Sequence, residues 1–395
     1  MTKIVKLEEL ASVKGGKRLP KGVNLITTPN SHPYIRVRDL NNRHTLELNN
    51  DFEYVDDETQ KSIARYIVDR GDIVLSIVGT IGLVAIVGDS LHHANLTENC
   101  VKLTKLNGVD RDYLYYFLKS ELGQAEIAKG TVGAVQAKLP IKNIQAIDVV
   151  LPTLEHQKKI ASILAAIDYK IETNEKINDN LYEMVNAYYI SLFREVECEM
   201  TTIGSYAKHI YSGGTPTTSN DAYWNGAFGW FSSGETRNRF VITTDKTITQ
   251  AGVDNSSTKL ATKHDIVMAS AGQGFTRGQT SMLLIDTYVN QSVIVIHAER
   301  NVLPYLFWNL ANRYDELRAI SDSSSIRGSL TTKMIAAFEI PLANEESLKA
   351  FTDFSWSIIP QIENNLLENE RLTALRDLLL PKLISGEIDI SDIRF

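Results

Sequence analysis

The clearest pattern in the chain is a long series of mostly apolar positions whose spacing alternates between four and three residues. It lies within residues 155–193, where neither glycine nor proline interrupts it. This spacing predicts a helix whose apolar stripe packs against another helix, as in a coiled coil. At a rise of about 1.5 Å per residue, the helix is expected to be roughly 58 Å long. The stripe consists of Ile160, Leu164, Ile167, Ile171, Asn174, Asn178, Leu181, Val185, Tyr188 and Leu192.

A second, less apolar stripe follows at an offset of 191 residues and repeats both asparagines. The asparagines have two interpretations: a partly hydrated gap that the interface tolerates, or polar groups that meet across it and fix its register. Pro360 is expected to bend or break this second helix near its start, and Pro381 to stop it. The stripe consists of Phe351, Ser355, Ile358, Ile362, Asn365, Asn369, Leu372, Arg376, Leu379 and Leu383.

The segments before the two helices also repeat, and their short apolar runs with Gly, Thr and Ser between them predict strands. Residues 72–75, Asp-Ile-Val-Leu, recur as Asp-Ile-Val-Met at 265–268, an offset of 193. Residues 113–116, Tyr-Leu-Tyr-Tyr, recur as Tyr-Leu-Phe-Trp at 305–308, an offset of 192. A nearly constant offset over so long a stretch indicates an internal duplication.

The duplication predicts an α+β chain with two similar strand-rich domains separated by two long helices. Packing of the helices on each other as an antiparallel coiled coil would bury both stripes and give a pseudo-two-fold molecule. The uncharged run at residues 73–88 is too short to cross a bilayer and is expected to form two strands with a turn. The expected boundaries are 1–152 for the first domain, 153–198 for the first helix, 199–341 for the second domain and 342–395 for the second helix.

Composition excludes several classes of protein. With 395 residues, 43% hydrophobic and 23% charged, the chain has the composition of an ordinary globular protein with two or three domains. Its two cysteines, Cys100 and Cys198, provide no disulfide framework and fit a reducing cytoplasm. The first residues lack the apolar stretch of a secretory signal, so we expect a cytoplasmic protein without a membrane partner.

The motifs of common catalytic sites are missing from the sequence. It contains no Gly-x4-Gly-Lys-Ser/Thr, Gly-x-Ser-x-Gly, His-Glu-x-x-His or Cys-x-x-Cys motif, and no Pro-Pro pair, which excludes the Asn-Pro-Pro-aromatic loop of amino-methyltransferases. His92, His93 and Cys100 lie close together, but their spacing matches no common metal site. Cys100 is interpreted as a small core residue in a strand. We therefore expect neither catalysis nor a cofactor in this chain.

Charge is distributed unevenly, which favours a recognition surface. The formal net charge of −7 argues mildly against a nucleic-acid binder, but residues 13–38 hold six basic residues and no acidic one. Such side chains suit phosphates and base edges, and the alternative is a solvated charged surface. The candidates are Lys14, Lys17, Arg18, Lys21, Arg36, Arg38, Gln136 and Lys138 in the first half, and Arg237, Asn238, Arg239, Gln273, Thr276, Arg277 and Arg327 in the second.

Several motifs resemble those of a known family. Residues 151–160, Leu-Pro-Thr-Leu-Glu-His-Gln-Lys-Lys-Ile, are similar to the Leu-Pro-x-Leu-x-x-Gln-x-x-Ile pattern that begins the first conserved helix of type I restriction-modification specificity subunits. Residues 375–388, Leu-Arg-Asp-Leu-Leu-Leu-Pro-Lys-Leu-Ile-Ser-Gly-Glu-Ile, resemble the carboxy-terminal motif of the same family. Gly-Thr-Pro at 214–216 and Gly-Asp-Ile-Val at 71–74 resemble motifs of its target recognition domains. The resemblance covers essentially the whole chain, although residues 341–347 lack the usual Gln.

The resemblance implies a DNA-reading subunit without catalysis of its own. Its two target recognition domains would each read one half of a two-part sequence, and its helices would set the spacer and dock the partners. The implied partners are double-stranded DNA, two methyltransferase subunits that methylate adenine N6 with S-adenosylmethionine, and translocase-nuclease subunits that use ATP and Mg²⁺.

Two other functions stay open. A non-catalytic spacer or adaptor whose domains bind polypeptides would show no DNA selectivity, with or without partners. An enzyme with an unrecognised site would turn over substrate as the purified chain alone.

Overall fold

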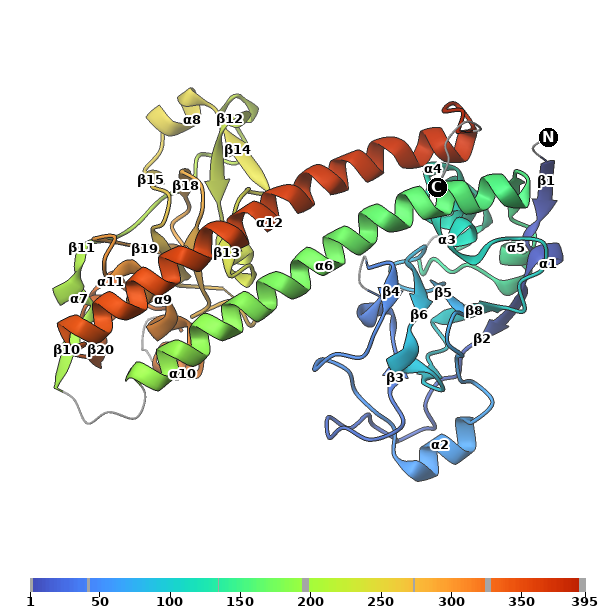
Figure 1. Cartoon of the computed structure of the whole chain (residues 1–395), viewed down its shortest axis with the longest axis horizontal. Helices are drawn as coiled ribbons and strands as arrows, with labels where there is room; N and C mark the ends of the chain where they lie inside the picture. The colour runs from blue at the N-terminus through green and yellow to red at the C-terminus, as the bar shows by residue number, and fades with distance from the viewer. Residues whose placement is uncertain are drawn as a thin grey trace. The chain divides into compact units, whose positions relative to one another are not determined.

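The chain forms two compact units, and each contains one strand-rich domain and part of both long helices (Figure 1). This computed structural model describes residues 3–40, 43–133, 135–193, 199–272, 274–323 and 328–390. Unit 1 consists of Met1–Thr173 and Asn369–Phe395, and unit 2 of Asn174–Glu368. Each long helix therefore belongs to both units.

Unit 1 is built on a five-stranded sheet in the order β2-β8-β5-β6-β4. The expected strand pair within residues 73–88 is confirmed as β5 and β6, which pair antiparallel with Ile73 opposite Ile86. The elements are β1 (Lys3–Lys6), α1 (Leu7–Leu10), β2 (Ser12–Gly15), β3 (Tyr34–Ile35), η1 (Val37–Asp39), β4 (Thr45–Leu46), α2 (Asp57–Ile63), β5 (Ile73–Ser76), β6 (Val84–Val87), η2 (Asp89–Leu91), β7 (Asn95–Leu96), β8 (Cys100–Thr104), α3 (Arg111–Lys119), α4 (Glu121–Gly130), α5 (Ile141–Gln145) and β9 (Asp148–Leu151), followed by α6 (Leu154–Phe193).

Unit 2 repeats this architecture, which confirms the internal duplication. Its five-stranded sheet has the order β11-β19-β16-β17-β13, so each strand corresponds to the strand at the same place in unit 1. The elements are β10 (Met200–Thr202), α7 (Ile203–Tyr206), β11 (Ala207–Ser212), η3 (Asp221–Tyr223), β12 (Trp224–Phe231), η4 (Ser233–Arg237), β13 (Phe240–Val241), β14 (Lys246–Ile248), α8 (Gln250–Asp254), β15 (Lys259–Ala261), β16 (Ile266–Ala269), β17 (Thr280–Leu283), β18 (Thr287–Val289), β19 (Val293–Ala298), α9 (Leu303–Ala311), α10 (Tyr314–Ser323), α11 (Thr332–Ala336) and β20 (Glu339–Pro341), followed by α12 (Glu345–Ser385).

The central strands are buried on both sides, because apolar clusters cover both faces of each five-stranded sheet. Successive side chains of a strand point to opposite faces. In β5, Ile73 belongs to the cluster that also contains α3, whereas Val74 belongs to the cluster on the other face. In β16, Ile266 and Val267 are divided in the same way. Two-sided burial explains why these strands read as continuous apolar runs in the sequence.

The two long helices run antiparallel within each unit. In unit 1 the Asn369 amide donates to the Ile171 carbonyl at 3.3 Å, while Asp168, earlier in α6, contacts Arg376, later in α12. In unit 2 Asn365 donates to Asn178 at 2.7 Å, and Asn174, earlier in α6, donates to Glu368 at 2.8 Å. Along the predicted stripe, Ile160, Leu164, Ile167, Asn174 and Ile362 are buried, and Ile171, Asn178, Leu181, Asn365, Asn369 and Leu372 are half-buried.

The asparagines therefore do meet a partner helix. Asn178 and Asn365 contact each other directly, and Asn369 donates to a backbone carbonyl of α6. This geometry favours the second interpretation of the two, in which polar groups on the stripe fix the register of the helices. That they fix the register stays a prediction.

The expectations that Pro360 breaks the second helix and that Pro381 stops it are wrong. Helix α12 does not break at Pro360 and does not stop at Pro381, because it runs from Glu345 to Ser385. Pro360 is exposed, so water can solvate the carbonyl that loses its N–H partner, while the adjacent Ile359 is buried in the core of unit 2. Tertiary packing thus outweighs the local cost of the proline. The helix ends before Gly386, which has a φ of +79°.

The first turns of the two long helices show what the Gln of the family's helix-start pattern does in α6 and how α12 begins without it. Gln157 is buried, and its amide joins α6 to the start of α3, because Oε1 accepts from the Asp110 N–H at 2.8 Å. In α12 no Gln stands at this place; instead the Asn344 side chain caps the helix by accepting from the Ser347 N–H at 2.8 Å. The altered motif therefore still begins a helix.

Candidate nucleic-acid interface

A hollow on the surface of unit 1 brings together three of the predicted basic residues. Its volume is about 370 Å³, and Arg18, Arg36 and Arg38 line it together with Tyr34 and Glu98. Strand β3 positions Arg36 and Arg38, because Arg36 follows the strand directly and begins the 3₁₀-helix η1 that carries Arg38. The buried Tyr34, in the same strand, donates from its hydroxyl to the carbonyl of Lys17, which precedes Arg18, at 2.7 Å.

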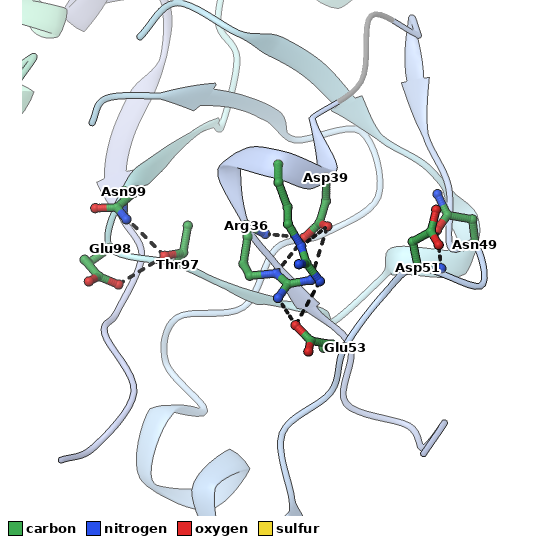
Figure 2. Close-up of polar contacts among 9 residues, drawn as sticks. Arg36, Asp39, Asn49, Asp51, Glu53, Thr97, Glu98 and Asn99 are labelled. Carbon is green, nitrogen blue, oxygen red and sulfur yellow. Dashed lines mark hydrogen bonds and ion pairs between the residues drawn. The ribbon is translucent and has the colours of Figure 1, made fainter. Parts of the chain in front are cut away.

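Acidic residues outside the basic run pair with all three arginines. Arg36 contacts Glu53 and lies 3.3 Å from Asp39 (Figure 2). Arg38 Nη2 lies 2.9 Å from Glu53 Oε2. Arg18 Nε lies 2.6 Å from Glu98 Oε1. The absence of acidic residues within 13–38 therefore does not leave these arginines unpaired. The exposed pairs of Arg18 and Arg38 contribute little stability, whereas the Arg36–Asp39 pair is largely buried. All of these pairs hold the guanidinium planes in place.

The electrostatics of the Arg18–Glu98 pair follow from its position at the rim of the hollow. Burial raises the pKa of the Glu98 carboxyl, but the hydrogen bond from Arg18 and those from neighbouring groups outweigh it, so the pKa lies below its ordinary value. The pair is therefore charged on both sides at neutral pH. A phosphate that approaches Arg18 has to compete with this carboxylate.

A buried acid shapes the corresponding loop in both units. Asp39 accepts from the Arg36 N–H at 2.7 Å and so begins η1. Glu235 accepts from the Ser232 N–H at 2.6 Å and begins η4 in the same way. Both carboxylates are buried. The two domains therefore present the segment after this turn in the same manner, although its side chains differ.

Three lysines of the basic run are free for an anionic ligand. Lys14, Lys17 and Lys21 are exposed, and in the part of the chain that the structure describes no carboxylate pairs with them. Lys17 Nζ lies 5.6 Å from the centre of the Tyr66 ring, a cation–π contact that leaves its charge uncompensated. These lysines suit contacts with phosphates, which require charge more than fixed geometry.

The basic candidates of unit 2 lie against its part of the long helices. Arg237, Asn238 and Arg239 line a hollow of about 520 Å³ whose other wall comes from α6 and α12. The Arg239 guanidinium stacks 4.1 Å above the Tyr182 ring and lies 3.4 Å from Asp179 Oδ1, while Arg237 Nε donates to the Gly234 carbonyl at 2.8 Å. Their contact with DNA stays a prediction.

The remaining candidates lie on loops beside the central strands. Gln136 and Lys138 are exposed on the loop that precedes α5. Thr276 and Arg277 lie between β16 and β17, but the Arg277 side chain is only 12% exposed, because it pairs with Asp322. It also donates to the Gly328 carbonyl at 2.6 Å, so it supports its loop. Gln273 and Arg327 lie outside the described residues.

The structure separates the histidines from Cys100. Within the described ranges, the one group that could hold a metal ion is exposed and consists of Asp69, His92 and His93. The Lys102 ammonium lies 3.6 Å from Asp69, and the Arg70 N–H donates to His92 Nδ1 at 3.2 Å. A nearby cation and an occupied nitrogen both disfavour a metal there. Cys100 is buried in β8 and belongs to the core, as predicted.

The Cys100 thiol should be unreactive in the native chain. Burial raises its pKa, and the thiolate is the reactive form. In a Cys198→Ser variant, alkylation at pH 8 is expected to be at least roughly tenfold slower for the native than for the denatured chain. The measurement is the rate of iodoacetamide incorporation by mass spectrometry. Equal rates would contradict the burial of β8.

Two leucines of α12 expose an apolar surface. Leu375 and Leu378 are 44% and 59% exposed, and their separation of three residues places them on one face of the helix. At an offset of 191 residues, the corresponding positions of α6 are Met184, which is 44% exposed, and the exposed Ala187. Each unit therefore exposes apolar side chains at corresponding places on a long helix.

Comparison with known proteins reveals similarity over almost the entire chain. The family described as type I restriction modification DNA specificity domain matches residues 2–183 and 195–373. The type I restriction enzyme MjaIX specificity subunit of Methanocaldococcus jannaschii is 20% identical, over 91% of this chain and 88% of that protein. The EcoR124I/EcoR124II specificity subunit of Escherichia coli is 26% identical, over 68% of this chain and 70% of that protein.

A solved structure shows the same fold. The crystal structure of the S subunit of a type I restriction-modification system from M. genitalium matches with a TM-score of 0.60 and 16% identity, covering 97% of this chain and 96% of that chain. Among the described residues, no helix is long and apolar enough to cross a membrane.

Proposed function

Since the chain belongs to the type I restriction-modification DNA specificity family, we propose that its two units each read one half of a two-part DNA sequence. The observation that carries the proposal is the duplication: both units contain a five-stranded sheet with the same strand order and the same acid-capped turn. Duplicated reading domains that differ in surface side chains suit two half-sites that differ in sequence.

Recognition divides into contacts with the DNA backbone and contacts with bases. The exposed lysines of unit 1 bind phosphates, which gives affinity without sequence information. Arg36 and Arg38, whose planes are fixed by Glu53 and Asp39, suit the two-pronged contact that guanidinium groups make with guanine in the major groove. The chain itself supplies no catalytic group.

The partners are two methyltransferase subunits and, in a restriction complex, translocase-nuclease subunits. The methyltransferases bind S-adenosylmethionine and methylate adenine N6 after flipping the base out of the duplex. ATP and Mg²⁺ belong to the translocase-nuclease, and the complex works in the cytoplasm, where DNA is available. The exposed apolar positions on α6 and α12 dock the methyltransferases, and the helices set the number of unread base pairs between the half-sites.

Removing the three free lysines should weaken DNA binding and its dependence on salt. A Lys14→Ala, Lys17→Ala, Lys21→Ala variant is expected to lower the slope of log K against log salt by up to about 0.9 for each phosphate that the chain no longer neutralises. The measurement is fluorescence anisotropy of a labelled duplex with the full chain and its methyltransferase. Lys349→Ala, whose ammonium pairs with Asp353 at 2.6 Å, serves as the control. An unchanged slope in the triple variant would remove these lysines from the interface.

The proposed function itself is tested by selectivity. The chain with its methyltransferase should retain duplexes that contain one two-part sequence and release duplexes in which either half is changed. Equal retention of all duplexes would favour an adaptor without DNA specificity. Turnover by the chain alone would favour an enzyme.

A further inference from the structure

The most exposed large apolar side chain of each unit lies on a loop beside the central strands. Among the described residues of unit 1 this side chain is Val135, which is 103% exposed, and in unit 2 it is Phe275, which is 84% exposed. Leaving such side chains in water forgoes the free energy of burying them. A single exposed apolar side chain is common on a protein surface. However, the most exposed one of each unit lies on a loop that also carries predicted DNA-contacting residues, which points to a ligand that covers it.

The two side chains occupy corresponding regions of the duplicated fold. In unit 1 the loop that carries Val135 is joined to the end of β5, because the Leu139 N–H donates to the Ile77 carbonyl at 2.9 Å. In unit 2 the Leu330 N–H donates to the Ser270 carbonyl at 2.8 Å, which joins the corresponding loop to the end of β16. Val135 lies on the loop before Leu139 in unit 1. Phe275 lies on the loop that follows β16 in unit 2, which is the other loop of the joined pair.

Neighbouring side chains hold the backbone around Phe275, while the ring points into solvent. The Tyr314 hydroxyl donates to the Phe275 carbonyl at 2.6 Å, and the Arg318 guanidinium donates to the Gly274 carbonyl. Arg277 anchors the other side of the loop through the Gly328 carbonyl. Side chains from α10 and from the loop itself thus fix the peptide, so the ring is presented in a defined place.

The hairpin around Val135 is fixed by its own backbone. Val132 and Lys138 exchange two hydrogen bonds of 2.8 and 2.9 Å, and Lys138 also forms a bridge with Val78 of the loop between β5 and β6. Predicted DNA-contacting residues of both units lie on the same loops: Gln136 and Lys138 beside Val135, and Thr276 and Arg277 beside Phe275.

We infer that Phe275 inserts among the bases of the half-site that unit 2 reads, where its ring stacks on a base, and that Val135 makes the corresponding apolar contact in the other half-site. The inference rests on the proposed function. Apolar side chains that DNA-binding proteins insert between base steps unstack them and favour sequences that deform easily. Phe275 would therefore determine specificity through stacking and deformation of the duplex.

The surroundings of Phe275 favour DNA over a protein partner. Within the described part of unit 2, the other large apolar side chains with high exposure are Met184, Met200, Phe228, Leu260 and Leu342, and none lies on this loop or on α10. A protein interface needs a cluster of apolar side chains at its centre. The Phe275 ring stands alone among polar groups. Its loop is held by the guanidiniums of Arg277 and Arg318, which both contact the Asp322 carboxylate. Such surroundings suit a base that lies between phosphates.

The test uses the full chain in complex with its methyltransferase and duplexes that carry the two-part sequence found by mapping adenine methylation. 2-Aminopurine replaces one base at a time throughout both half-sites, and its fluorescence reports unstacking. Apart from the adenines that the methyltransferases flip, the wild type is expected to give increased fluorescence at a step in one half-site. Phe275→Ala should abolish this signal and weaken binding roughly tenfold or more, whereas Phe275→Trp should keep both.

Controls separate the possible outcomes. Because the ring is exposed, Phe275→Ala should not change the melting temperature, and Leu342→Ala, an exposed apolar residue away from this loop, should leave both DNA readouts unchanged. Unchanged affinity and fluorescence in Phe275→Ala would overturn the inference and leave the proposed function intact. If Phe275→Ala loses the methyltransferase but keeps the DNA signal, the inference is also overturned, because the ring would then be a protein contact. Failure of the wild type to select any duplex would instead contradict the proposed function.

Discussion

Replacing Arg376 with alanine is expected to lower the free energy of unfolding by about 3–5 kcal/mol, because it leaves a buried carboxylate without its cation. Within unit 1, Arg376 Nη1 lies 2.8 Å from Asp168 Oδ1, and the Tyr116 hydroxyl donates to Asp168 Oδ2 at 2.7 Å. The Asp168 side chain is only 6% exposed. Burial, with the negative charge of Asp168 adding to it, raises the pKa of Tyr116, so Tyr116 stays a neutral donor. The measurement is the melting temperature and the urea midpoint.

The duplication offers a matched control for this network. The corresponding positions of unit 2 are Trp308, Ile359 and Val185, all buried and none of them charged. A Tyr116→Phe, Asp168→Ile, Arg376→Val variant should therefore recover most of the stability that Arg376→Ala loses, since apolar groups of suitable volume can replace a buried ion pair. If Arg376→Ala melts at the same temperature as the wild type, the ion pair does not hold unit 1 together.

Placing charges on the exposed face of α12 is expected to remove one methyltransferase from the complex. A Leu375→Glu, Leu378→Glu variant would bury two carboxylates in the proposed interface, and the affinity should fall by a factor of about 30 or more. Leu342→Glu is the control, because Leu342 has the same exposure of 44% as Leu375 and precedes α12 in the chain. The measurement is mass photometry of the assembled complex.

The duplication extends this prediction to the other unit. Met184 of α6 occupies the position that corresponds to Leu375, so Met184→Glu should remove the second methyltransferase and leave the first. Combining the three substitutions should leave the chain without either subunit. Complexes that keep two methyltransferases in all variants would contradict docking at these positions.

Periodicity and internal repetition made much of the fold predictable. The alternating spacing that contains Ile160 and Leu164 predicted α6, and the fixed offset to Ile362 and Asn365 predicted its partner, because burial of an apolar stripe requires these periods. The same offset related β5 to β16 and so predicted two similar sheets. Both predictions use local or repeated information, which a single sequence contains.

Contacts between residues far apart in the chain were not predictable in this way. The pairing of Arg36 with Glu53 and of Arg18 with Glu98 depends on how loops return to one place, which neither composition nor periodicity encodes. Pro360 was misjudged because packing around it outweighs its local preference. The exposure of Phe275 was not predicted, because the burial of a loop side chain depends on tertiary contacts and not on the local sequence.

The central claim is that the two units read half-sites whose separation depends on the long helices. The boundary between the units crosses α6 after Thr173 and α12 after Glu368, so seven residues of helical sequence can be inserted at both places while both stripes stay in phase. This insertion adds about 10.5 Å to each helix, or roughly three base-pair rises.

Mapping of adenine methylation in a host that carries the chain with its methyltransferase tests this claim most directly. For the wild type, it should give one two-part sequence with an unread spacer. For the paired insertion, both half-sites should stay the same and the spacer should lengthen by about three base pairs. An unchanged spacer, or a methylated sequence without two separate parts, would contradict the account.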